Sequence, residues 1–168
     1  MSMDRSNECL IEHRPAGRVL EFVAFRWPTP DLAAADWPIT PGGVRHDTSG
    51  RPALLHFAPG RWLAPSPGPD VVALFDHTAR DGAGTLIEAT GKWEPLNISG
   101  SGAGRLLAST LEVASVLAGR GCAAVTLFDC PAVIASADQG FALWVQASYA
   151  THFSDTAERC SKALYPAR

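Results

Sequence analysis

The run from Cys122 to Leu164 constrains the fold of this chain more than any other part of its sequence. The stretches "CAAVTLF" and "AVIAS" have the composition of strands, and "FALWVQA" predicts a third. The connection "ADQG" places Gly140 where a short hairpin loop needs a left-handed residue. Apolar residues then recur at helical spacing, and Pro166 ends the pattern: Tyr149, Phe153, Ala157, Cys160 and Leu164. Adjacent strands followed by an amphipathic helix predict an α+β fold with a mixed or antiparallel sheet and packed helices.

Alternation within the last strand predicts which side chains face the helix. Phe141, Leu143 and Val145 share one face, and Ala142, Trp144 and Gln146 share the other. We expect the first face to lie against Phe153 and Cys160, with both of these buried. Because Gln146 makes the second face half polar, we expect Trp144 to be partly exposed.

The middle of the chain predicts further strands and helices. Residues 53–65 predict a strand broken at Pro59-Gly60, and residues 70–82 a short helix that Gly82 ends. Two extended runs fall within 84–100, separated by a turn at Thr90-Gly91. A helix is predicted next, capped by Ser99 or Ser101, with its apolar face made by Ala103, Leu106, Leu107, Leu111 and Ala114.

The first 51 residues differ in character from the rest. After the apolar run "RVLEFVAFRW" at 18–27, five of the thirteen prolines fall between positions 28 and 52, which excludes a long helix or a central strand there. We therefore predict an extended, proline-rich arm with one possible strand at 1–51, followed by an α+β domain at 52–168. The length of 168 residues suits one hydrophobic core.

Composition narrows the classes of function. A formal net charge of -3 without a basic run argues against a nucleic-acid or anionic-membrane ligand. The N-terminal stretch lacks the apolar segment of a signal peptide, so a cytoplasmic location is expected. Cysteines 9, 122, 130 and 160 have neither disulfide density nor zinc-site spacing, which predicts free thiols and no metal site. Charged residues make up only 18% of the chain, which leaves room for a partner chain on its surface.

Asp129, Cys130 and His152 are the candidates for a reactive thiol site. On a helix of 3.6 residues per turn, His152 points roughly 100 degrees away from its buried neighbour Phe153. Local geometry therefore does not direct His152 toward Cys130, and an unpaired cysteine is usually buried. Asp129, just before Cys130-Pro131, has the position of a turn residue. No catalytic residue is predicted.

The stretch "NISGSGAGRLL" imitates a dinucleotide-binding loop. The fingerprint needs a third glycine three positions after the second, and that position holds Arg105 or Leu107, depending on which glycine is first. The expected acid, Asp129, lies 29 residues beyond Gly100 and precedes a hairpin instead of a parallel crossover. A small-residue turn that lets the following helix pack closely is the favoured interpretation.

The order of several motifs resembles a known family. These are "APGRWLAP", "LNISGSGAGRLLAS", "GRGCAAVTLFDCPAVI" and "FALWVQASYATHF", which together cover roughly residues 52–160. In this order they resemble the gamma subunit of the heterotetrameric sarcosine oxidases, whose fold is similar to the folate-binding domain of the glycine cleavage aminomethyltransferase. The sequence departs from that family at Ala147, where an arginine is common, and at Ser101, where a proline is common.

The resemblance implies an accessory subunit without its own catalytic, cofactor or metal site. The family's assembly oxidises sarcosine to glycine and passes the one-carbon unit to tetrahydrofolate, while FAD, FMN and NAD sit in other subunits. Its implied partners are larger flavoprotein chains of alpha and beta type, and the isolated chain could also form a homo-oligomer. Trp27, Trp37 and Trp144 are the predicted partner-interface residues; Trp27 and Trp37 could equally fold back onto the chain's own core.

Other functions stay open at this point. A free-standing folate- or pterin-binding domain would need a carboxylate beside an aromatic wall, for which Glu88, Glu94 and Trp93 are the candidates. A dinucleotide-binding protein and a thiol enzyme rank below it.

Overall fold

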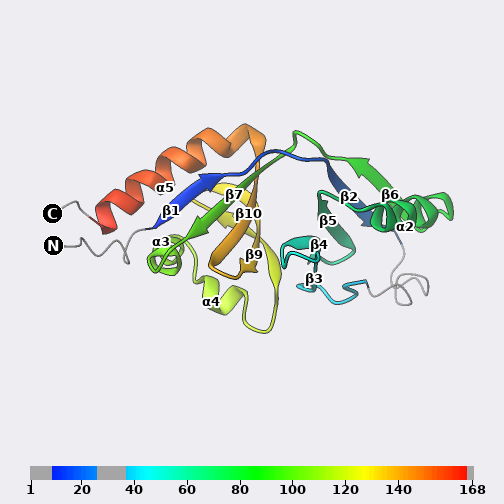
Figure 1. Cartoon of the computed structure of the whole chain (residues 1–168), viewed down its shortest axis with the longest axis horizontal. Helices are drawn as coiled ribbons and strands as arrows, with labels where there is room; N and C mark the ends of the chain where they lie inside the picture. The colour runs from blue at the N-terminus through cyan, green and yellow to red at the C-terminus, as the bar shows by residue number, and fades with distance from the viewer. Residues whose placement is uncertain (1–8, 26–36, 166–168) are drawn as a thin grey trace.

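Two five-stranded antiparallel sheets form the framework of the molecule. The computed structural model describes residues 9–25 and 37–165 (Figure 1). The first sheet, sheet A, has the strand order β1-β7-β10-β9-β8. Its strands are β1 (Leu10–His13), β7 (Trp93–Ser99), β8 (Cys122–Leu127), β9 (Cys130–Ala137) and β10 (Gly140–Gln146). The α+β class and the antiparallel pairing are as predicted.

The second sheet, sheet B, has the strand order β3-β4-β5-β2-β6. Its strands are β2 (Val19–Ala24), β3 (Val44–His46), β4 (Pro52–Ala58), β5 (Arg61–Pro65) and β6 (Gly84–Glu88). The turn between β4 and β5 contains Gly60 at φ +64°, so the predicted break at Pro59-Gly60 is a hairpin turn.

Helices cover the outer face of each sheet. Helix α2 (Pro69–Arg80) lies on sheet B, where Val71 and Phe75 pack against Phe22 and Trp62. Helices α3 (Ala103–Ala108), α4 (Val113–Val116) and α5 (Ala150–Leu164) lie on sheet A, and the 3-10 turn η2 (Ala147–Tyr149) leads into α5. Figure 1 shows the two sheets between α5 and α2. In the described residues, none of the helices has the length and apolar character needed to span a bilayer.

A core between the two sheets joins them into one body. Leu55 and Leu63 of sheet B pack in one cluster with Val133, Ala142 and Trp144 of sheet A. The carboxylate of Glu21, on β2, is also buried there, with 1% of its side chain exposed. It accepts hydrogen bonds from Lys92 Nζ at 2.7 Å and from Trp93 Nε1. Trp93 is the first residue of β7 and Lys92 directly precedes it, so this contact links the sheets.

The N-terminal segment is not the extended arm that the prolines predicted. Its described residues supply three strands in place of one: β1 pairs with β7 in sheet A, and β2 lies between β5 and β6 in sheet B. Strand β3 pairs with β4 at the other edge of sheet B. The prolines from Pro15 to Pro41 lie between these strands in the sequence, and Pro52 begins β4, so they do not interrupt β1, β2 or β3.

In the C-terminal hairpins the side chains of β10 lie on the predicted faces of the sheet, but the exposure predicted for one of them is wrong. Leu143 and Val145 belong to the core under α5 together with Phe153 and Ala157. Trp144 points to the opposite face, as expected, but only 2% of it is exposed. The prediction that Trp144 is partly exposed was wrong, because sheet B covers that face.

The helix predicted after Ser101 is divided in two. Helix α3 ends at Ala108, and α4 begins only at Val113, so the helical pattern does not continue through Leu111. Val113 is buried, whereas Ala114, predicted for the apolar face, is exposed. Neither Ser99 nor Ser101 caps α3, whose N-cap residue is Gly102 without a side-chain cap bond.

Replacing Phe153 by alanine is expected to lower the free energy of unfolding by roughly 3 to 5 kcal/mol. The ring is fully buried and meets the Phe128 ring edge-on, at 5.4 Å between centroids. Urea unfolding followed by circular dichroism measures the change. Glu158→Ala on the exposed face of the same helix is the control, since its 3.5 Å ion pair with Lys162 is solvent-exposed. A loss below about 1 kcal/mol for Phe153→Ala would contradict this packing.

Candidate functional site

The aromatic residues predicted for a partner interface are buried or lie outside the described residues. Trp37 is 4% exposed and packs edge-on against Phe75, at 4.8 Å between ring centroids. It folds back onto the chain's own core, one of the two alternatives for this residue. Trp144 is buried between the sheets. Trp27 lies outside the described residues.

The residues considered for a thiol site do not assemble into one. The Cys130 thiol is buried and donates to the backbone carbonyls of Phe128 and Tyr149, at 3.3 Å and 3.9 Å. Burial, with a smaller effect of the Asp129 charge, raises the pKa of Cys130. Phe128 and Asp129 form the β8–β9 turn, both with positive φ, so Asp129 is a turn residue as predicted. His152 is exposed on α5, and no hydrogen bond joins it to Cys130 in the described part of the chain.

The glycine-rich turn before α3 is used for packing. A Cβ atom on Gly102 would come within 2.8 Å of the Tyr165 ring, and the Tyr165 hydroxyl donates to the Gly102 carbonyl at 3.4 Å. Gly102 therefore allows Tyr165, which follows α5, to pack closely against this turn, as the small-residue interpretation predicts. These residues do not fit a dinucleotide.

The pterin candidates are not gathered around one cleft. Glu88 accepts from Arg18 Nε at 3.0 Å on the surface, and Glu94 contacts His13 at 3.2 Å. Trp93 is 5% exposed, and its indole N–H donates to Glu21 in the core between the sheets. These residues therefore do not fit a pterin. In the described residues, no three His, Cys, Asp or Glu side chains are placed to hold a metal ion.

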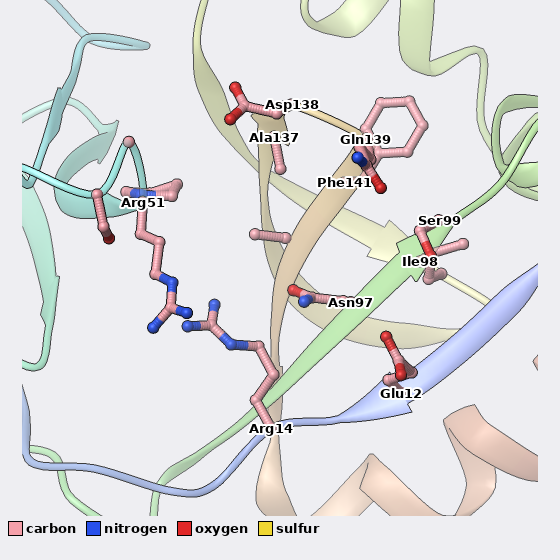
Figure 2. Close-up of a pocket in the computed structure, with 14 residues that line it drawn as sticks. Glu12, Arg14, Arg51, Asn97, Ile98, Ser99, Ala137, Asp138, Gln139 and Phe141 are labelled. Carbon is pink, nitrogen blue, oxygen red and sulfur yellow. The ribbon is translucent and has the colours of Figure 1, made fainter.

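A cleft that sequence reasoning missed lies where the two sheets meet. It has a volume of about 420 Å³ and is lined by residues of β1, β7 and β10, by the β9–β10 turn and by the β3–β4 turn (Figure 2). Its polar lining comes from Glu12, Arg14, Ser49, Arg51, Asn97, Ser99, Asp138 and Gln139. A smaller hollow of about 100 Å³ shares Arg14, Arg51 and Pro52 with it and is also lined by Trp144.

Two arginines dominate the middle of this cleft. Figure 2 shows the guanidinium groups of Arg14 and Arg51 pointing toward one another from opposite walls. Arg14 follows β1, where its backbone N–H donates to the Pro95 carbonyl at 2.9 Å. Arg51 precedes β4 of sheet B. The two sheets thus each contribute one cation to the same cleft.

The turn that carries Arg51 is shaped by Asp47. One oxygen of its carboxylate accepts from the Ser49 N–H at 2.8 Å, the Ser49 hydroxyl at 2.6 Å and the Arg51 N–H at 3.0 Å. These bonds, the one from the Ser49 hydroxyl first, hold the pKa of Asp47 below its usual value. The carboxylate therefore stays ionised near neutral pH and fixes the backbone from which Arg51 extends.

No local motif could have revealed this cleft. Arg14, Arg51, Asn97 and Asp138 come from four separate connections or strands, and only the packing of both sheets brings them together.

The arginines determine what the cleft can bind. Donors from a fork-shaped guanidinium match the geometry of carboxylate and phosphate oxygens. The arrangement can therefore hold an oxyanion.

Comparison with known proteins shows the fold. No family model matches the sequence, and a search of curated proteins found no significant relative. Among solved structures, the chain is similar to a chain of the heterotetrameric sarcosine oxidase from Corynebacterium sp. U-96, determined in complex with pyrrole 2-carboxylate. The TM-score is 0.75 at 17% sequence identity, over 97% of this chain and 88% of that chain. At this identity the likeness shows a shared α+β fold.

Thiol labelling in the native state is expected to spare Cys122 and Cys130. Burial raises the pKa of Cys122 to about 12 and also raises that of Cys130, and the thiolate is the reactive form. At neutral pH we expect iodoacetamide to modify Cys122 more slowly than in the unfolded chain by more than about tenfold, because each pKa unit removes tenfold of the thiolate. Cys130 should also be slowed. Peptide mass spectrometry measures both rates, with the guanidinium-unfolded chain as the control. Rapid, selective modification of native Cys130 would reopen the thiol-enzyme hypothesis.

Proposed function

We propose that this chain is an accessory subunit of a multi-chain oxidase of the sarcosine oxidase type. The observation that carries the proposal is the likeness to a chain of a heterotetrameric sarcosine oxidase over 97% of this chain and 88% of that one. A match of nearly the whole length of both chains supports a corresponding role, because no large domain of either is left without a counterpart. The motif resemblance in residues 52–160 points to the gamma subunit in particular.

In this proposal the chemistry belongs to the partner chains. The thiol, glycine-turn and pterin candidates of this chain are each engaged in packing, turns or surface ion pairs. FAD, FMN, NAD and tetrahydrofolate would be held by larger flavoprotein subunits that oxidise sarcosine or another N-methyl amino acid. All four cysteines are free thiols, which suits a reducing compartment such as the cytoplasm.

One end of sheet B offers a surface on which a larger chain could pack. Ile87 lies on β6, an edge strand, and is paired with Glu21, so it shares the face that sheet A covers elsewhere. Phe25 follows β2 and is 66% exposed, the largest value among the exposed large hydrophobic residues. Val23 and Thr85, which are paired and half-buried, lie between them along the two strands. We propose this stripe as part of the subunit interface.

Co-expression with flavoprotein alpha- and beta-type chains of a sarcosine oxidase tests the proposal. We expect the three products to elute together in size-exclusion chromatography. Phe25→Glu combined with Ile87→Thr should release this chain from the complex, because a charge would have to be buried without a partner and the apolar contact of Ile87 would be lost. The thermal midpoint of the isolated chain should change little, since both residues are exposed.

Leu10→Glu is the matched control for the interface variant. Leu10 is 52% exposed, but it lies on β1 of sheet A. The complex should survive this change. Elution of the unmodified chain as a monomer that retains neither flavoprotein would argue against a subunit role, and equal loss with both variants would argue against the stripe.

A further inference from the structure

The arginine pair in the cleft between the sheets has no part in the proposed subunit role. Arginine remains charged at all physiological pH values, so Arg14 and Arg51 present two cations that face one another. Like charges at close range repel, and an anion between them reverses the sign of the interaction. Neither guanidinium has a hydrogen bond or ion pair within 4 Å to a carboxylate among the described residues.

The acids around the cleft leave this central position to a ligand. One carboxylate oxygen of Asp47 accepts hydrogen bonds within its own turn, and the charge of the carboxylate also interacts with Arg51. Glu12 and Asp138 line the same cleft, but Figure 2 shows their carboxylates away from the guanidinium pair, on β1 and on the β9–β10 turn. These acids make a ligand with several anionic groups less favourable than one with a single anionic group. Asn97, on β7, adds an amide to the lining of the cleft.

We propose that this cleft binds a small organic molecule through one oxyanion group, a carboxylate or a phosphate, held between Arg14 and Arg51. Its volume of about 420 Å³ falls within the range of small-molecule sites, roughly 300–1,000 Å³. The guanidinium forks supply paired donors to the oxyanion, and Asn97 supplies an amide to a polar group next to it. Because Arg14 follows β1 of sheet A and Arg51 precedes β4 of sheet B, the ligand would bridge the sheets. This inference does not depend on the proposed subunit role.

Calorimetric titration of the full chain with matched probes tests the inference. N-acetylglycine carries a carboxylate, N-acetylglycinamide has the same size without the charge, and inorganic phosphate represents the other oxyanion source. We expect N-acetylglycine or phosphate to bind at millimolar concentration, and N-acetylglycinamide not to bind. Arg14→Gln and Arg51→Gln should each weaken binding about tenfold or more, the effect of losing one charged hydrogen-bond donor.

Arg80→Gln is the charge-matched control. Arg80 lies on α2 with 81% of its side chain exposed. Its substitution should leave binding unchanged. Circular dichroism checks that each variant folds. Two further variants, Arg14→Lys and Arg51→Lys, keep the charge but lose the forked guanidinium, and they should bind with intermediate affinity. Phosphate binding with the same arginine dependence would assign the site to phosphate compounds. The inference is overturned if neither anion binds at millimolar concentration, if the amide probe binds equally well, or if Arg80→Gln weakens binding as much as the cleft variants.

Discussion

The buried carboxylate of Glu21 is the contact on which the arrangement of the two sheets depends. Moving a carboxylate out of water is costly unless cations and donors replace its hydration. Here Lys92 and Trp93 of the β7 end supply two of these donors, and Arg61 of β5 approaches the second oxygen at 3.4 Å. β2 carries the acid, Trp93 is the first residue of β7 and Lys92 directly precedes it, so sheet B satisfies its buried charge only when sheet A is in place. Lys92 and Arg61 remain about half exposed, so the surrounding apolar core still supplies most of the stability.

The packing of the sheets also explains which parts of the fold the sequence could predict. Local patterns were sufficient for the hairpins, for α2 and for α5, because turn residues and apolar periodicity lie within each element. They were insufficient for Trp144, whose burial depends on Leu55 and Leu63 some eighty residues earlier in the chain. The N-terminal strands were underestimated for the same reason: β2 pairs with β5 and β6, and neither partner is adjacent in sequence. The apolar spacing that predicted one helix placed Ala114 on the buried face, whereas the structure buries Val113 there and divides α3 from α4.

The candidate sites show the same limit more strongly. Asp129, Cys130 and His152 lie in one short stretch of the sequence but do not form a site. Asp129 belongs to a turn, Cys130 to the core and His152 to the surface. The cleft that can hold an oxyanion is built from connections of both sheets. Thirty-six residues of the sequence lie between Arg14 and Arg51. Its existence depends on the relative position of the sheets, and so on the Glu21 contact. The fold, the cleft and the stripe proposed as a partner surface are therefore consequences of one packing arrangement, in which sheet A covers only part of sheet B.

A double-mutant cycle at Glu21 and Lys92 tests this dependence most directly. The free energy of unfolding would be measured in urea for the unmodified chain, Glu21→Gln, Lys92→Met and the double variant. This dependence predicts a single cooperative transition and a loss of about 1–3 kcal/mol for Lys92→Met, because its removal leaves a buried acid with fewer donors. It also predicts a double variant more stable than additivity by at least about 0.5 kcal/mol. Additivity within about 0.3 kcal/mol, or two separate transitions for the two sheets in the unmodified chain, would contradict it.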